Sequence, residues 1–252
     1  MSDETMPEQG LMRAVAVVTF AGMAVFLSGT WLYARFGGSV VDAFDEELGE
    51  VLMERGMRFE EAGSLENAKA VYAEALNCPF QGPQNRADTQ KRLGVLYWQA
   101  GDLDAAVRCL QPAAEAEPPP VSVFEPLCDC LLSLGRLAEA QEVVFRWMER
   151  AGELRLPAEK GKAKYYEGKI ALAEGDRQRA ETAFLEGLRE LPGGRNASEL
   201  GQMYYEQGRH AEALPQIDAY LLTGTGERAE YFRWLRGHIL KLLQEKETGT
   251  MP

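Results

Sequence analysis

The sequence has few of the residues that cross-link small domains or hold metal ions. Its 252 residues include only four cysteines and two histidines. Four cysteines in a chain of this length do not make a disulfide framework. Cys128 and Cys130, two residues apart, would lie about 200° apart around a helix axis and do not suit one metal ion. We expect all four to be buried as small apolar residues: Cys78, Cys109, Cys128 and Cys130.

Positive charge is also scarce. Lys and Arg number 27 against 39 Asp and Glu, and the formal net charge is −12. This balance argues against nucleic acid as a partner. Neither His210 nor His238 begins a metal-ligand spacing, and no glycine-rich phosphate loop joins a strand to a helix. Because no cluster of acid, base and nucleophile is present, we expect no catalytic activity, no cofactor and no metal.

One segment lacks charge altogether. Residues 14–34 read AVAVVTFAGMAVFLSGTWLYA, between Arg13 and Arg35. As a helix rising about 1.5 Å per residue, this segment would be about 31 Å long, close to the thickness of a bilayer hydrocarbon core. It predicts a lipid-spanning anchor over residues 14–36 behind a polar acidic tail, residues 1–13. A cleaved signal peptide is the alternative, although such peptides begin with a short basic region rather than an acidic one.

The side of the membrane that the remainder faces stays open. The positive-inside rule gives a tie, because one arginine lies on each flank of the apolar segment. An acidic tail that is easily translocated and unpaired cysteines favour a cytoplasmic body. The usual arrangement of an uncleaved amino-terminal anchor keeps the short tail inside and favours the opposite.

Strand patterns are missing from the rest of the chain. No run of alternating apolar and polar residues with β-branched enrichment is long enough to predict a strand. After a hinge at residues 37–44, the pattern is helical over residues 45–246, and residues 247–252 form a flexible tail. The sequence therefore predicts an all-α body.

The helical part repeats one register five times. Turn glycines stand at Gly63, Gly101, Gly135, Gly175 and Gly208, spaced 38, 34, 40 and 33 residues apart. Five residues after each glycine comes an alanine: Ala68, Ala106, Ala140, Ala180 and Ala213. Seven residues before each comes a small residue: Gly56, Gly94, Cys128, Gly168 and Gly201. Nine residues after each comes a large apolar residue: Tyr72, Leu110, Val144, Phe184 and Ile217.

This register is what two closely packed antiparallel helices require. The glycine ends the first helix in a conformation that residues with a Cβ resist, so the chain reverses within a few residues. The small residues let the two backbones approach, and the large apolar residue fills the space beside them. Each pair leaves one face uncovered, so the pairs are expected to stack as a solenoid.

The chain resembles the tetratricopeptide repeat family over roughly residues 45–246. The clearest copies are LGVLYWQAGDLDAAVRCLQPAAEAEP, residues 93–118, and LGQMYYEQGRHAEAL, residues 200–214. Three looser copies depart from the pattern in places, with Cys128 for glycine and Ala171 for the usual aromatic, and Pro215 falls inside a second helix. Extra loop is expected at residues 78–86 and 153–162, and the last helical segment is expected to cap the stack. The predicted fold is thus a single amino-terminal transmembrane helix followed by about five hairpins and a carboxyl-terminal capping helix.

The resemblance implies a concave groove, lined by the first helices of successive pairs, that binds partner proteins or peptides. Carried over by register, the predicted partner-binding residues are Lys91, Trp98, Lys162, Tyr165, Lys169, Arg195, Gln202, Tyr205, Tyr231, Trp234 and His238. This set predicts a basic and aromatic distal wall, with Lys162, Lys169 and Arg195 together. The aromatic members either face the groove or pack between helices. Asn196, Ala197 and Ser198 also match a glycosylation acceptor.

The expected function is a membrane-tethered interaction scaffold or assembly factor, similar to single-span repeat proteins of the bacterial inner membrane. Its partners would be proteins or peptides associated with the membrane. The alternative is a soluble exported or periplasmic adaptor whose first segment is removed.

Overall fold

The computed structural model describes residues 38–248, in which every regular element is helical. The chain divides into two compact units between Gly82 and Pro83. The predicted tail at 1–13, the predicted anchor at 14–36 and residues 249–252 lie outside the described residues. No helix within residues 38–248 has the length and apolar character needed to cross a membrane.

The first unit contains one helix pair, α2 (Gly38–Glu61) and α3 (Leu65–Ala75). Residues 38–44, predicted as a hinge, are instead helical, so the helical body begins at Gly38 rather than at residue 45. Leu52 of α2 packs with Val71 and Ala75 of α3 in a small core.

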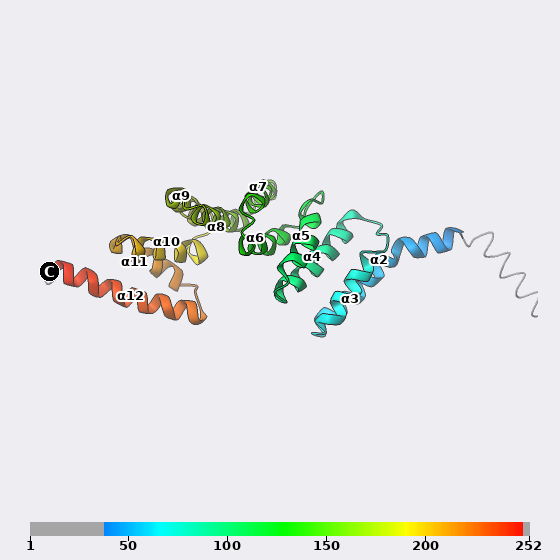
Figure 1. Cartoon of the computed structure of the whole chain (residues 1–252), viewed down its shortest axis with the longest axis horizontal. Coiled ribbons are helices and arrows are strands. Elements are labelled where there is room, and N and C mark those ends of the chain that lie inside the picture. The colour runs from blue at the N-terminus through cyan, green and yellow to red at the C-terminus, as the bar shows by residue number, and fades with distance from the viewer. Residues whose placement is uncertain (1–37, 249–252) are drawn as a thin grey trace, which may run out of the picture. The chain divides into compact units, whose positions relative to one another are not determined.

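The second unit contains four more pairs and a last single helix within the described residues (Figure 1). Its elements are α4 (Pro83–Gln99), α5 (Leu103–Ala114), the short 3-10 helix η2 (Val121–Val123), α6 (Phe124–Ser133), α7 (Leu137–Glu153), α8 (Pro157–Ala173), α9 (Arg177–Glu190), α10 (Gly194–Glu206), α11 (His210–Leu221) and α12 (Gly226–Glu247). The five predicted hairpins are therefore α2–α3, α4–α5, α6–α7, α8–α9 and α10–α11. The last helix, α12, buries Phe232, Leu235 and Ile239.

The turns inside the pairs confirm the predicted register. All five turn glycines have φ between +70° and +85°, a region that residues with a Cβ adopt only with strain. In the fourth pair, Gly175 N–H donates to the Leu172 carbonyl at 3.1 Å and Asp176 N–H donates to that of Ala171 at 2.9 Å. The Asp176 side chain then accepts a hydrogen bond from Arg179 N–H, so the residue after the glycine caps the next helix.

The close approach of paired helices is confirmed as well. A Cβ added to Gly168 would lie 2.3 Å from the Phe184 ring, and one added to Gly94 would lie 2.5 Å from Leu110. The alanines of the register, from Ala68 to Ala213, are fully buried. In the third pair Cys128 replaces glycine, and Val144, the smallest of the five facing residues, lies in the same core cluster. The smaller partner leaves room for the sulfur.

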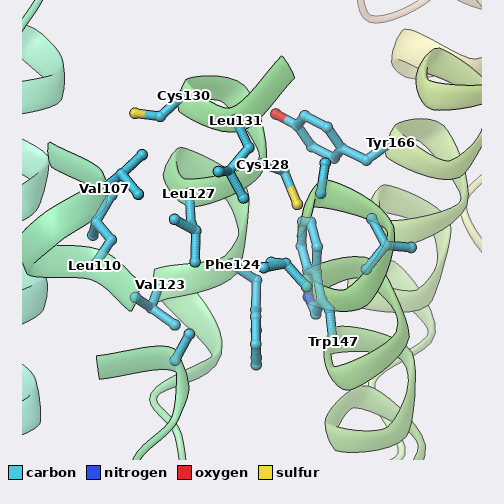
Figure 2. Packing of buried hydrophobic residues seen from close by; sticks show 14 of the residues in the cluster. Val107, Leu110, Val123, Phe124, Leu127, Cys128, Cys130, Leu131, Trp147 and Tyr166 are labelled. Atoms are coloured by element: carbon cyan, nitrogen blue, oxygen red, sulfur yellow. The ribbon is translucent and has the colours of Figure 1, made fainter. Parts of the chain in front are cut away.

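Trp147 of α7 joins three helices of the second unit (Figure 2). Its ring stacks on Phe124 of α6 at a centroid distance of 5.9 Å and lies 5.7 Å from the ring of Tyr166 of α8. Figure 2 also shows Cys128 and Cys130 pointing to opposite sides of α6. Desolvation by burial raises the pKa of both thiols, that of Cys130 to about 11.

The expected burial of the cysteines is correct for two of the four. Cys128 and Cys130 lie in the core, whereas Cys78 and Cys109 are only partly buried. Cys78 follows the end of α3, where the chain leaves the helix pair. All four are free thiols.

The loop predicted at residues 153–162 is wrong. The extra residues lengthen α7 to Glu153 and begin α8 at Pro157, which leaves a three-residue turn. Arg155 in that turn has φ +54°, and the N–H groups of Arg155 and Leu156 repeat the hydrogen bonds of the glycine turns. An arginine thus holds a conformation that glycine holds elsewhere, and for this reason the sequence does not reveal the turn.

Candidate partner-binding groove

First helices of three successive pairs form an apolar cleft in the second unit. We call this hollow of about 630 Å³ the apolar cleft. Its lining residues are Val95 and Trp98 of α4, Val121, Ser122, Glu125 and Pro126 of η2 and α6, and Leu156, Pro157, Ala158, Glu159 and Lys162 at the start of α8. Of the predicted residues, Trp98 and Lys162 lie here.

A second hollow of about 210 Å³ adjoins the first and shares Glu125 and Lys162 with it. We call it the tyrosine hollow, because Tyr165 and Tyr166 of α8 line it together with Leu191, Gly194, Arg195 and Asn196. The Arg195 guanidinium lies 5.6 Å from the centre of the Tyr165 ring. The two hollows therefore form one groove that passes from α4 to α10, with Glu125 and Lys162 at the junction.

Glu125 bridges the two nearest bases of the groove. Its Oε2 lies 3.4 Å from Nζ of Lys162 on α8, and its Oε1 lies 3.0 Å from Nη1 of Arg195 on α10. Lys162 also donates to Oε1 of Glu159 at 2.9 Å. Arg195 donates to the hydroxyl of Tyr166 at 3.3 Å, and that hydroxyl donates to Asp129 at 2.6 Å.

A second bridge lies further along α8 and α10, among residues that line neither hollow. Glu199 of α10, which is almost fully buried, receives Lys169 of α8 at 3.3 Å and Arg228 of α12 at 2.7 Å. We call the four bases and their partners the charged wall: Lys162, Lys169, Arg195, Arg228, Glu125, Glu159 and Glu199. Each base is thus paired with at least one carboxylate, which offsets part of the positive charge predicted for this wall.

These contacts shift the pKa values of the groups involved. Desolvation lowers the pKa of Lys162, but the hydrogen bond to Glu159 and the charge of Glu125 outweigh it, so the net shift is upward. Burial likewise lowers the pKa of Arg195, but its interactions with Tyr166 and Glu125 outweigh burial, so the net shift is upward. Burial raises the pKa of Asp129 more than the Tyr166 hydrogen bond and Arg195 lower it. Lys162 and Arg195 thus remain charged at neutral pH.

Two of the other predicted residues, Lys91 and Gln202, pair within their own helices. Lys91 on α4 donates to Asp88 at 2.8 Å on its own helix and contacts none of the bases above. Gln202 donates to Glu206 at 3.1 Å, one turn further along α10.

The remaining four residues form a row of rings over α10 and α12. Trp234 stacks parallel to His238 at 5.6 Å and on Tyr231 at 6.0 Å, while Tyr205 meets His238 at 6.0 Å. Tyr231 and Trp234 are exposed, whereas Tyr205 and Tyr165 are partly buried by packing. Of the predicted aromatic residues, some are therefore exposed and others are packed between helices.

Sequence reasoning missed the acidic half of the groove. The predicted set contained no residue of the third pair, although Glu125 precedes Cys128 by three residues as Lys91 precedes Gly94. The same register therefore pointed to Glu125. The pairing of Glu199 with α8 and α12 has no comparable signal in the sequence, because it depends on the stacking of separate pairs.

Two further expectations concern a glycosylation motif and metal binding. Asn196 of the glycosylation motif is buried, and its Nδ2 donates to the Gly161 carbonyl at 3.0 Å, so it is inaccessible in the folded chain. Within residues 38–248, no group of three or more His, Cys, Asp or Glu side chains is placed to hold a metal ion.

Comparison with known proteins places the chain in a family. A profile of the tetratricopeptide repeat matches residues 91–151 and 165–230, which together make up half of the chain. The chain belongs to the tetratricopeptide repeat family, whose members are protein interaction scaffolds. No curated protein sequence matches it.

Several solved structures have a similar fold. Pseudomonas aeruginosa PilF has 17% identity and a TM-score of 0.62, over 82% of this chain and 89% of its own. The Thermus thermophilus protein TTC0263 has 18% identity and a TM-score of 0.53, over 76% of this chain and 98% of its own. MamA of Desulfovibrio magneticus RS-1 has 16% identity and a TM-score of 0.56, over 70% of this chain and 95% of its own. At these identities the likeness concerns the fold alone.

Proposed function

We propose that this protein is a membrane-tethered scaffold or assembly factor that binds a partner protein through the apolar cleft and the adjoining tyrosine hollow. The observation that carries the proposal is the apolar cleft itself, built from side chains of α4, α6 and α8. A cleft of this size beside a polar rim has the character of a protein recognition site. Trp98 in its lining belongs to the residue types that contribute most to binding energy at such sites.

The tether is proposed from the sequence of residues 14–34. That segment is uncharged and long enough to span a bilayer, and it lies shortly before α2. A single span, in our proposal in a bacterial inner membrane, would hold the groove near membrane-associated partners and raise their effective concentration. The net charge of −12 supports protein rather than nucleic acid as the partner.

The proposal is tested by filling the cleft without disturbing the core. Ala158 is an exposed cleft residue in the first turn of α8, and Ala138 is an exposed alanine in the first turn of α7 that lines neither hollow. We expect A158W to lose the proteins that the tagged full-length chain captures from detergent-solubilised membranes, while A138W retains them. Retention of the same proteins by A158W would refute binding through the cleft.

A further inference from the structure

The ion pairs of the charged wall all have the same orientation. In each pair the base is the more exposed member. The Lys162 side chain is 40% exposed, against 27% for Glu125 and 21% for Glu159. The Arg195 side chain is 55% exposed, against 27% for Glu125. Lys169 and Arg228 are 35% and 48% exposed, against 10% for Glu199. A partner entering the groove therefore meets the more exposed bases Lys162 and Arg195 before the less exposed carboxylates that pair with them, whereas Lys169 and Arg228 line neither hollow.

The bases keep hydrogen-bond donors to spare, whereas the carboxylates are occupied. Nη2 and Nε of Arg195 bond to none of the described residues, because its bonds to Glu125 and Tyr166 both use Nη1. Glu125 uses both oxygens, and Glu159 accepts from Lys162 with Oε1 and from the Trp147 indole with Oε2 at 3.1 Å. Unused donors call for a ligand that brings acceptors.

Resting on the function proposed above, we propose that the groove binds an extended acidic segment whose apolar side chain enters the apolar cleft and whose carboxylates meet Lys162 and Arg195. The order of the hollows fixes the order of the ligand. The apolar side chain lies on the α4 side of Lys162, and the carboxylate lies on the α10 side, over the tyrosine hollow. Bidentate pairing with the free edge of Arg195 would provide the directional contact.

Glu125 opposes this ligand from within the protein. It pairs with both Lys162 and Arg195 and offsets part of the positive charge that the ligand's carboxylates would approach. Its charge lowers the affinity for an acidic segment and discriminates against weakly charged ones. Removal of that single charge, without change of shape, should therefore strengthen binding.

The test uses the full-length chain in a mild non-ionic detergent and a set of fluorescent peptides with both ends capped. Each peptide carries Leu, Phe or Trp next to an Asp-Glu pair placed before or after it, and each has a twin with Asn-Gln instead. Capping removes the terminal carboxylate, so that any preference for the acidic member reports side-chain recognition. Fluorescence anisotropy gives the dissociation constants.

We expect at least one acidic peptide to bind about tenfold more tightly than its amide twin. K162Q should remove most of that difference, and E125Q should enlarge it by about threefold to tenfold. E181Q is the matched control, because Glu181 of α9 accepts from Arg209 and Tyr204 away from both hollows. Unchanged circular dichroism melting shows that the variants remain folded.

Two results would overturn the inference. If no acidic peptide binds more tightly than its amide twin, the bases of the charged wall do not recognise carboxylates. If E125Q weakens binding while remaining folded, Glu125 supports the ligand rather than opposing it. Neither result bears on the proposed function, which is tested separately by the capture of partners with the cleft-filling variant A158W.

Discussion

At the scale of single residues, the contact between the helices of each pair depends on one missing side chain. Gly168 of α8 faces Phe184 of α9 so closely that an added Cβ would lie 2.3 Å from the ring. Phe184 is fully buried, so its ring cannot withdraw into solvent. A side chain larger than that of glycine would therefore displace the Phe184 ring or move one helix away from the other.

We predict that G168A lowers the free energy of unfolding by about 1–3 kcal/mol through overpacking. G237A on α12 is the control, because an added Cβ there meets no atom within 4 Å. In a helix interior that exchange should instead stabilise by about 0.5–1 kcal/mol. Urea unfolding monitored by circular dichroism distinguishes the two, and equal effects would show that the α8–α9 contact is wrongly assigned.

Arg155 provides the opposite case, a residue with a Cβ in a conformation that favours glycine. Its φ of +54° is strained for an arginine, and its side chain is exposed. R155G should therefore raise the free energy of unfolding by about 0.5–1 kcal/mol. In the same unfolding assay, G175A should lower the free energy of unfolding by a similar amount, because Gly175 has φ +85° and no atom lies within 4 Å of the added Cβ. Destabilisation by R155G would show that the arginine side chain makes a contact worth more than the strain.

At the scale of helices, the sequence predicted which helices pair more accurately than it predicted where each helix begins and ends. The register of Gly, Ala and large apolar residues is local, because it describes contacts inside one pair, and each of its positions lies where expected. The additional residues around 153–162 predict a loop because Pro157 and Gly161 interrupt the pattern. Pro157 instead occupies the first turn of α8, where its missing N–H costs no hydrogen bond.

The composition of the groove was harder to predict, for a related reason. Lys162, Arg195 and Trp98 were found because they share a register position or face with other repeats. The carboxylates of Glu125 and Glu199 act between pairs, and the separation of 37 residues between Glu125 and Lys162 carries no periodic signal. Charge pairing across stacked helices depends on three-dimensional placement, so the sequence predicted the bases of the wall without the carboxylates that offset part of their charge.

Trp147 carries the main element-scale prediction. Its ring packs between Phe124 of α6 and Tyr166 of α8, and it is fully buried. W147A should cost about 3–5 kcal/mol, because it leaves a cavity at the junction of three helices. E159Q keeps an acceptor for the Trp147 indole and should cost less than about 1 kcal/mol. Thermal unfolding of the two variants tests this, and similar midpoints would contradict the central role of Trp147.

At the scale of the whole molecule, the proposal joins a membrane segment to a recognition groove. If residues 14–34 span a bilayer, the full-length protein should stay in the membrane pellet after alkaline carbonate extraction. Deletion of residues 1–36 should release a soluble chain that keeps its helical circular dichroism. Recovery of the full-length protein in the carbonate supernatant would contradict the span.

Amino-terminal sequencing separates the tether from its alternative. A mature protein that begins near Thr30, as read by amino-terminal sequencing, would have lost the apolar segment as a cleaved signal peptide. The groove lies far along the chain from this segment and would be unchanged. The protein would then be a soluble exported adaptor with the same binding surface.

The central claim is that the apolar cleft is the surface that meets a partner, and site-specific photo-crosslinking in intact membranes tests it most directly. A photoreactive phenylalanine analogue replaces either Ser122, an exposed residue of the cleft, or Phe145, an exposed residue of α7 outside both hollows. We predict a discrete crosslinked product from position 122 that disappears in the A158W background, and none from position 145. A product from position 145 with none from position 122 would contradict the account.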